Sequence, residues 1–275
     1  MRTLRSLATS VAAIALTAIV FVVPFVFIIL QAVKTPEEAR LLSFDWPSQF
    51  RVVENIQEVF EARNYMLVIA FINSTVLTVS SVALMVVLAA MVAYVLQRRQ
   101  SRWNVLVNLC VMMGLIIPPA VVPTVWVLQK LGLFKTMTGM IFIEVAFGLA
   151  FCILLFRAFI SNIPKDLDEA AIIDGAGPIR LFFKVILPLL KPVVVTVVVV
   201  QSVFVFNDFA NPLYFFPGDA NATVQLTLYN FRSQYTTDYN LLFMNILLIT
   251  IPPLVAYMIF QRQIVSGMTA GAVKG

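Results

Sequence analysis

The sequence predicts an all-α polytopic membrane protein with six transmembrane helices, and two observations carry that prediction. Hydrophobic residues make up 61% of the 275-residue chain and charged residues only 12%, about half the charged fraction of soluble domains. The apolar residues also gather into six long runs, each near the roughly 20 residues that a helix needs to cross the hydrocarbon core. A water-soluble protein of this composition would expose large apolar patches.

The six runs define the predicted organisation of a single transmembrane domain over residues 1–275. We place the spans at about residues 9–32, 66–97, 105–129, 138–160, 185–209 and 241–261, with a cytoplasmic loop at 161–184. Prolines interrupt the third and sixth spans, and we expect kinks there, since a proline lacks the N–H that continues a helix. These prolines are Pro118, Pro119, Pro123, Pro252 and Pro253.

Basic residues predict the orientation. If both termini are cytoplasmic, 12 of the 19 lysines and arginines lie on the cytoplasmic side, with a tight cluster at Arg98, Arg99 and Arg102. Cytoplasmic loops carry this excess in membrane proteins, so we expect both ends inside. Arg2 and Arg5 precede the first run as in a signal peptide, but the run is longer than a signal-peptide apolar core. We therefore expect it to be retained as the first span.

Several chemistries are excluded by what the sequence lacks. The chain has no histidine, which removes histidine-dependent hydrolases and H-E-x-x-H metalloproteases. No G-x-x-x-x-G-K-[ST] loop is present, so ATP would have to be held by another subunit. Cys110 and Cys152 lie in apolar runs and show no metal-ligand spacing. The dispersed basic residues also form no stripe for nucleic acid. We expect no catalytic residue, metal site or cofactor in this chain.

The cytoplasmic loop has the pattern of two short helices joined by a glycine turn. Carboxylates at its start, Glu169 among them, favour the positive end of a helix dipole. Gly175 can adopt the left-handed conformation that ends a helix, and Pro178 suits the first position of the next. We expect that second helix to run on into the fifth span. The small Ala170–Ala171 pair would let a partner approach closely.

This loop resembles the EAA loop of ABC importer permeases, with Val185 where the family usually has isoleucine. The resemblance implies the type I ABC importer permease fold, in which the elbow is a coupling helix that docks on an ATP-binding subunit. It assigns coupling to Glu169, Ala170, Ala171, Asp174, Gly175, Leu187 and Pro188.

Three further segments are similar to carbohydrate-uptake permeases of the maltose-system type. They are Asn73-Ser74, the tail Phe260–Gly275, and Phe206–Phe209, in which Phe206 replaces the usual tryptophan. This resemblance implies a sugar cargo, an oligosaccharide in particular, and a bacterial inner membrane location. It also implies a second homologous permease, two ATP-binding subunits that use ATP and Mg, and an extracytoplasmic solute-binding protein.

Four polar residues are candidates for the substrate pathway. Glu144 is the lone acid within a span, and ionisable groups there are functional by default; it also lies near the outer end, within reach of the interface. Asn207 and Asp208 lie where an outer vestibule would be. Asn73 has the alternative of bonding a neighbouring helix.

Other functions stay open at this point. A permease for another solute, such as a glycerol phosphoester, is the main alternative, although the absence of basic residues deep in the spans disfavours an anionic cargo. Half of a secondary transporter is a second alternative, but no inverted repeat is visible. An intramembrane aspartyl enzyme is disfavoured because no Gly-x-Gly-Asp context surrounds Asp208 or Glu144.

Overall fold

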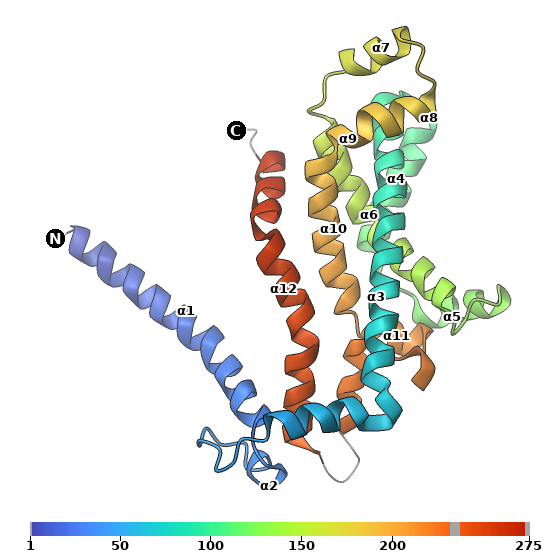
Figure 1. The fold of residues 1–275 in the computed structure, drawn as a ribbon. Coiled ribbons are helices and arrows are strands. Elements are labelled where there is room, and N and C mark those ends of the chain that lie inside the picture. Colours follow the sequence, from blue (N-terminus) through green and yellow to red (C-terminus); the bar gives the residue numbers. More distant parts are fainter. Residues whose placement is uncertain (1, 232–236, 273–275) are drawn as a thin grey trace. The chain divides into compact units, whose positions relative to one another are not determined.

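The computed structural model describes residues 2–231 and 237–272, and within them helices and connecting loops occur without a β-strand (Figure 1). The chain forms two compact units. The first combines Met1–Val68 with Leu226–Pro252, and the second combines Ile69–Gln225 with Pro253–Gly275. Helices α3 and α12 each contribute residues to both units, so the units are not consecutive stretches of the sequence. The prediction of a single transmembrane domain therefore stays a prediction.

The first unit gathers both ends of the sequence. It contains α1 (Arg2–Ala32), α2 (Pro36–Ala39), the first part of α3 (Val52–Arg98), most of the 3-10 helix η3 (Val224–Phe231) and the first part of α12 (Tyr239–Ala272). Helix α3 is not straight, because its backbone leaves helical geometry at 62–65. The kink therefore lies just before the predicted second span.

A buried amide holds the first unit together. The side-chain nitrogen of Asn55 donates to the carbonyls of Ala32, at 2.8 Å, and Lys34, at 3.1 Å. Asn240 in turn donates to the side-chain oxygen of Asn55 at 3.1 Å. Since buried polar groups must be paired to be tolerated, this network fixes how the chain turns from α1 into α3 beside the start of α12.

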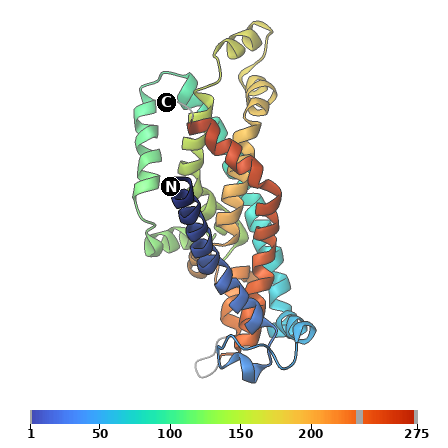
Figure 2. The same ribbon diagram turned by 90° about the vertical axis from the view of Figure 1, so that its left-hand side faces the viewer.

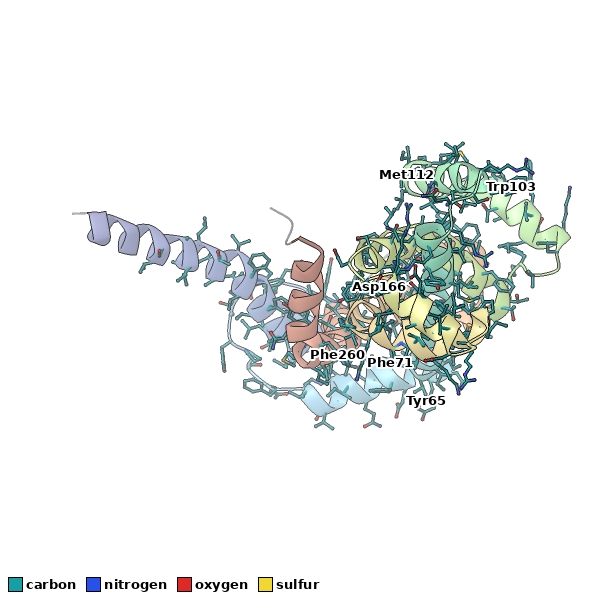
Figure 3. The ribbon with its side chains drawn as sticks, turned by 90° about the horizontal axis from the view of Figure 1, so that it is seen from above. Tyr65, Phe71, Trp103, Met112, Asp166 and Phe260 are labelled. Carbon is teal, nitrogen blue, oxygen red and sulfur yellow. The ribbon has the colours of Figure 1, made fainter. Side chains whose placement is uncertain are left out.

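The second unit contains the later part of α3, the end of α12 and the helices between α3 and η3, which can be followed in Figure 2. Its remaining elements are α4 (Trp103–Ile116), α5 (Val121–Lys130), α6 (Met137–Ile160), α7 (Asp166–Ile173), α8 (Pro178–Leu181), the π-helix η1 (Phe182–Ile186), α9 (Leu187–Leu189), α10 (Lys191–Phe206), α11 (Ala210–Phe215) and the 3-10 helix η2 (Asp219–Asn221). Figure 3, seen from the α7 end, labels Trp103 and Met112 at α4, and both side chains are exposed.

Small side chains let the helices of the second unit pack closely. Ala89 and Ala93 of α3 are fully buried in the same apolar core as Phe156 of α6. A Cβ added to Gly114 of α4 would lie 3.2 Å from the Cβ of Ala150 on α6. Small residues at such contacts let helix backbones approach in membranes, so α6 becomes the central helix of this unit.

Four of the six predicted spans correspond to single long helices, and the other two correspond to pairs of helices joined by a bend. Among the described residues, four helices are long and apolar enough to cross a membrane: α1, α3, α6 and α12. They cover the spans predicted at about 9–32, 66–97, 138–160 and 241–261. The other two predicted spans coincide with bent pairs, α4 with α5 at 118° and α8–α9 with α10 at 76°. The fold class is confirmed, and the count of six spans stays a prediction.

Prolines account for both bends. Pro118 and Pro119 occupy the break between α4 and α5, and Pro188 and Pro192 flank the break before α10; each removes a backbone donor. The helix from Pro178 runs on through Phe182 and Phe183 to Leu189, as the sequence predicts, but it includes a π-helical turn and meets α10 at a bend of 76°.

Candidate functional site

The loop at 161–184 folds as the elbow that its sequence predicts, at the end of the second unit beyond α10 (Figure 1). Helix α7 ends at Ile173, and Gly175 follows in the left-handed conformation, with φ +79°. The amide of Gly175 donates to the carbonyl of Ile172 and that of Ala176 to Ala171, both at 2.9 Å. This pair of bonds is the Schellman motif. Helix α8 then begins at Pro178, so the turn geometry is set by Gly175.

The elbow presents an apolar surface that no described residue covers. Ile173 is 85% exposed and Ile179 77%, and Ile172 is exposed beside them. Exposed apolar patches of this kind mark interaction sites. The two alanines of the loop differ: Ala170 is exposed, while Ala171 packs against the core of its own chain. Only Ala170 is therefore free to face a partner.

The remaining predicted coupling residues divide in the same way. Glu169, Asp174 and Pro188 are exposed, whereas Leu187 is half-buried against the core. Leu187 thus packs against the core of its own chain, whereas the exposed residues are accessible to a partner protein.

One buried carboxylate ties the elbow to α3. Asp168 is 8% exposed, and its Oδ2 lies 2.7 Å from Nε of Arg98. Its Oδ1 accepts a hydrogen bond from the hydroxyl of Tyr94 at 2.9 Å. Arg98 belongs to the basic cluster that predicts the orientation, and Asp168 is one of the carboxylates at the start of the loop, but their pairing is not predicted from the sequence. The available signal was the spacing of Tyr94 and Arg98, which places both on one face of a helix.

The second feature of this unit is a cavity of about 820 Å³ formed by α6, the end of α10 and α11. Aromatic rings form much of its wall, and the polar side chains come from α6, α10, α11 and the residues between α10 and α11. The polar lining includes Glu144, Gln201, Asn207, Asp208 and Asn211 beside Gly148, and the rings are Phe147, Phe151, Phe204 and Phe209. Three of the four residues predicted for the substrate pathway therefore come together in one cavity.

The polar groups of this cavity are partly satisfied by the chain itself. The carboxylate of Asp208 accepts from the backbone and side-chain nitrogens of Asn211. Asn207 accepts from Gln225 at 2.9 Å. Glu144 is only 6% exposed, and its Oε1 has no hydrogen-bond partner among the described residues. A buried unpaired acceptor of this kind is costly and is available to a donor that enters the cavity.

Asn73 lies outside the cavity lining and has a different set of contacts. Its side-chain nitrogen donates to the carbonyls of Ala220 and Ala222, both at 3.0 Å. The neighbouring Ser74 accepts from the amide of Val224 at 3.0 Å. Asn73 and Ser74 therefore hold the segment that leads to Gln225, the partner of Asn207.

Gln201 is a cavity residue that was not among those predicted from the sequence. It is buried in α10 and lines the cavity beside Gly148. Its signal was available, because it is a polar residue within a valine-rich run. For the tail Phe260–Gly275, the backbone of α12 is described to Ala272, and the side chains beyond Gln261 lie outside the described residues. No group of His, Cys, Asp and Glu in the described part of the chain has the arrangement of a metal site.

Comparison with known proteins places this chain in a family. Residues 85–270 match the family described as binding-protein-dependent transport system inner membrane component. The probable starch degradation products transport system permease protein of Thermoanaerobacterium thermosulfurigenes is 30% identical, over 94% of this chain and 93% of its own length. The diacetylchitobiose uptake system permease protein of Streptomyces coelicolor is 31% identical, over 98% and 90%.

A solved structure has the same fold. It belongs to a bacterial ABC transporter involved in the import of the acidic polysaccharide alginate, and it superposes with a TM-score of 0.81 at 18% identity, over 95% of this chain and 98% of that one. The family match and the permease relatives confirm the resemblance to ABC importer permeases. This multi-pass membrane protein belongs to the family of binding-protein-dependent transport system inner membrane components, the permease subunits of ABC importers.

Proposed function

We propose that this chain forms half of the translocation pore of an ATP-driven importer for a sugar, an oligosaccharide in particular. The single observation that carries the proposal is the uncovered apolar surface of the elbow, with Ile173 85% exposed, in a chain that has no ATP-binding loop of its own. A subunit that hydrolyses ATP must then dock from outside, and the elbow is the surface prepared for it.

The proposed complex joins this chain to three other kinds of subunit. A second, homologous permease completes the pore, two ATP-binding subunits hold ATP and Mg, and an extracytoplasmic binding protein delivers the cargo. This chain binds no cofactor. The docking side of the elbow is formed by Glu169, Ala170, Asp174 and Gly175, and its connection to the membrane helices by Ala171, Leu187 and Pro188.

The elbow side of the second unit faces the cytoplasm in this proposal, as do both termini. Arg98, Arg99 and Arg102 lie at the same end of the unit as the elbow, because Arg98 pairs with Asp168. The cavity lies near the opposite end, where α10 meets α11. This placement agrees with the excess of basic residues in cytoplasmic loops.

The cargo is proposed from the cavity and from the relatives. Rings beside hydroxyl-accepting carboxylates suit a neutral, hydroxyl-rich molecule, which presents apolar faces and many donors. Glu144, Asn207 and Asp208 would contact it, and Asn73 would act indirectly through the segment it holds. The matched relatives are named for starch degradation products and for diacetylchitobiose. The carboxylate of Asp208, with no lysine or arginine among the described lining residues, disfavours the alternative glycerol phosphoester, since like charges repel.

The test is uptake into proteoliposomes that contain the complete complex and its binding protein. We expect ATP-dependent import of at least one of maltotriose, raffinose and diacetylchitobiose, and none without ATP. Ile173→Asp should abolish co-purification of the ATP-binding subunits, because a charge enters the apolar docking surface. Uptake driven by an ion gradient, or by this chain without other subunits, would contradict the proposal.

A further inference from the structure

The end of α3 reaches both arms of the elbow. On the arm before α7, Nη2 of Arg98 donates to the carbonyls of Ile163, at 2.9 Å, and Pro164, at 3.3 Å. On the arm after α8, the ring of Tyr94 lies 5.8 Å from that of Phe182, the buried first residue of the π-helix. Together with the contacts to Asp168, these interactions clamp the elbow from one side.

Helix α7 has little else to fix its direction. Asp168 is its one buried residue, and Ala171 is its one half-buried residue. A methyl group packs without directional preference, because apolar contact is non-directional. After α7 the chain continues through Gly175, which has no side chain that could contact the core. The orientation of α7 within the described second unit therefore depends on where the Asp168 carboxylate points.

An ion pair is suited to that task. Replacing a buried pair by apolar residues is often neutral for stability, so its presence is better explained by specificity. The planar guanidinium of Arg98 is held at two edges, because its Nε pairs with Asp168 while its Nη2 donates to the carbonyls of Ile163 and Pro164. Here Asp168 contacts two groups one helical turn apart on α3: its Oδ1 accepts a hydrogen bond from the hydroxyl of Tyr94, and its Oδ2 forms an ion pair with Nε of Arg98. Two contacts from one rigid helix define a direction, which a single contact does not.

Helix α3 also leads to the cavity. A Cβ added to Gly148 of the cavity wall would lie 2.6 Å from Sδ of Met85 on α3. Met85 is fully buried and lies between Ile69 and Arg98 in the second unit. One continuous helix therefore contacts the elbow at its end and the cavity wall further along. Packed interiors transmit displacement, because they have few voids to absorb it.

We propose that Tyr94, Arg98 and Asp168, the α3–α7 joint, are positioning residues that make α7 and the end of α3 move as one body. Displacement of the elbow by an ATP-binding subunit then reaches the cavity through α3, in addition to the direct chain path into α10. This inference rests on the proposed function, in which the elbow is the docking element. It adds a second route from that element to the pore.

The test measures sugar molecules imported per ATP hydrolysed by the complete complex in proteoliposomes. The sugar is whichever of maltotriose, raffinose and diacetylchitobiose the wild-type complex imports. The variants are Asp168→Asn, which keeps the shape of the side chain, and Arg98→Lys, which keeps the charge but loses the planar guanidinium. The double variant combines the two substitutions. Asp166→Asn is the matched control, since Asp166 is exposed on the same helix. Tyr94→Phe removes one hydroxyl and covers the case in which the charge variants do not assemble.

We expect import per ATP to fall about tenfold in Asp168→Asn and Arg98→Lys, within the range by which residues on a coupling route alter coupling. The double variant should be no worse than either single, as for residues that act through one contact. If the three residues had a purely structural role, the variants would lower the yield of complex and leave import per ATP unchanged in the assembled fraction. That result would contradict the proposed α3–α7 joint. So would a double variant whose loss of import per ATP equals the two single losses combined. If Gly175→Val also leaves import per ATP unchanged, the docking role of the elbow fails instead.

Discussion

Gly148 of α6 and Met85 of α3 share a space that has no room for one more carbon. A Cβ at Gly148 would lie 2.6 Å from Sδ of Met85 and 2.8 Å from its terminal carbon. Both atoms lie at the end of a flexible side chain, but Met85 is fully buried, so its thioether would have to repack within the core to admit a methyl group. The absence of a side chain at Gly148 thus brings α6 and α3 together beside the cavity.

The first prediction follows from that contact. Gly148→Ala should destabilise the protein by about 1–3 kcal/mol, the usual penalty for overpacking a core. Thermal unfolding of the purified complex measures it. In a Met85→Ala background, which vacates the space, the same substitution should have little further effect. Equal destabilisation by Gly148→Ala in both backgrounds would show that Met85 is not the obstructing group.

The second prediction concerns the glycine turn of the elbow. Gly175 has φ +79°, and an added Cβ would meet nothing within 4 Å. Any penalty at this position therefore comes from the backbone alone. Gly175→Val should force the turn out of its geometry, at about 1–3 kcal/mol, and uncouple ATP hydrolysis from import. Gly175→Asn is the control, because asparagine visits the left-handed region routinely.

The readout for the turn is ATPase activity with and without loaded binding protein. Wild-type regulation in Gly175→Val would rule out the turn as a determinant of coupling. Equal damage in Gly175→Asn would show that the cause is something other than φ.

The third prediction concerns the cavity. Asp208→Ala should leave assembly and basal ATPase intact and lower sugar uptake by about tenfold, since a hydrogen bond to a charged group contributes about 1.5–3 kcal/mol. Glu144→Leu should do the same, because it removes the buried free acceptor. Tyr214→Phe on α11 is the control, since Tyr214 lies outside the lining. Unchanged uptake in both carboxylate variants would exclude the cavity from the cargo path.

The fourth prediction tests orientation by cysteine labelling. After Cys110 and Cys152 are replaced, Ala220→Cys should react with a membrane-impermeant reagent in intact cells. Gly177→Cys should react only after the membrane is opened. Both positions are exposed. The reverse pattern would place the elbow outside, where no ATP-binding subunit could reach it.

The sequence by itself determined the features that depend on neighbouring residues. Four of the six predicted spans coincide with long helices, because hydrophobic length is a local property. The turn at Gly175 was predictable for the same reason, since the bonds of a Schellman motif lie within six residues. The prolines likewise indicated where helices would be interrupted.

The tertiary structure decided which distant side chains meet. Asp168 and Arg98 are far apart in the sequence, and neither residue alone indicates the other as its partner. Glu144 and Asp208 share a cavity only because α6 packs against α10 and α11. Asn73 has the same polar character as the cavity residues, yet its helix position directs it to the carbonyls of Ala220 and Ala222. Whether a polar side chain can bind cargo or stabilises the fold depends on its burial and on the direction in which it points. Both are set by packing between segments that are distant in the sequence, so the sequence alone does not reveal them.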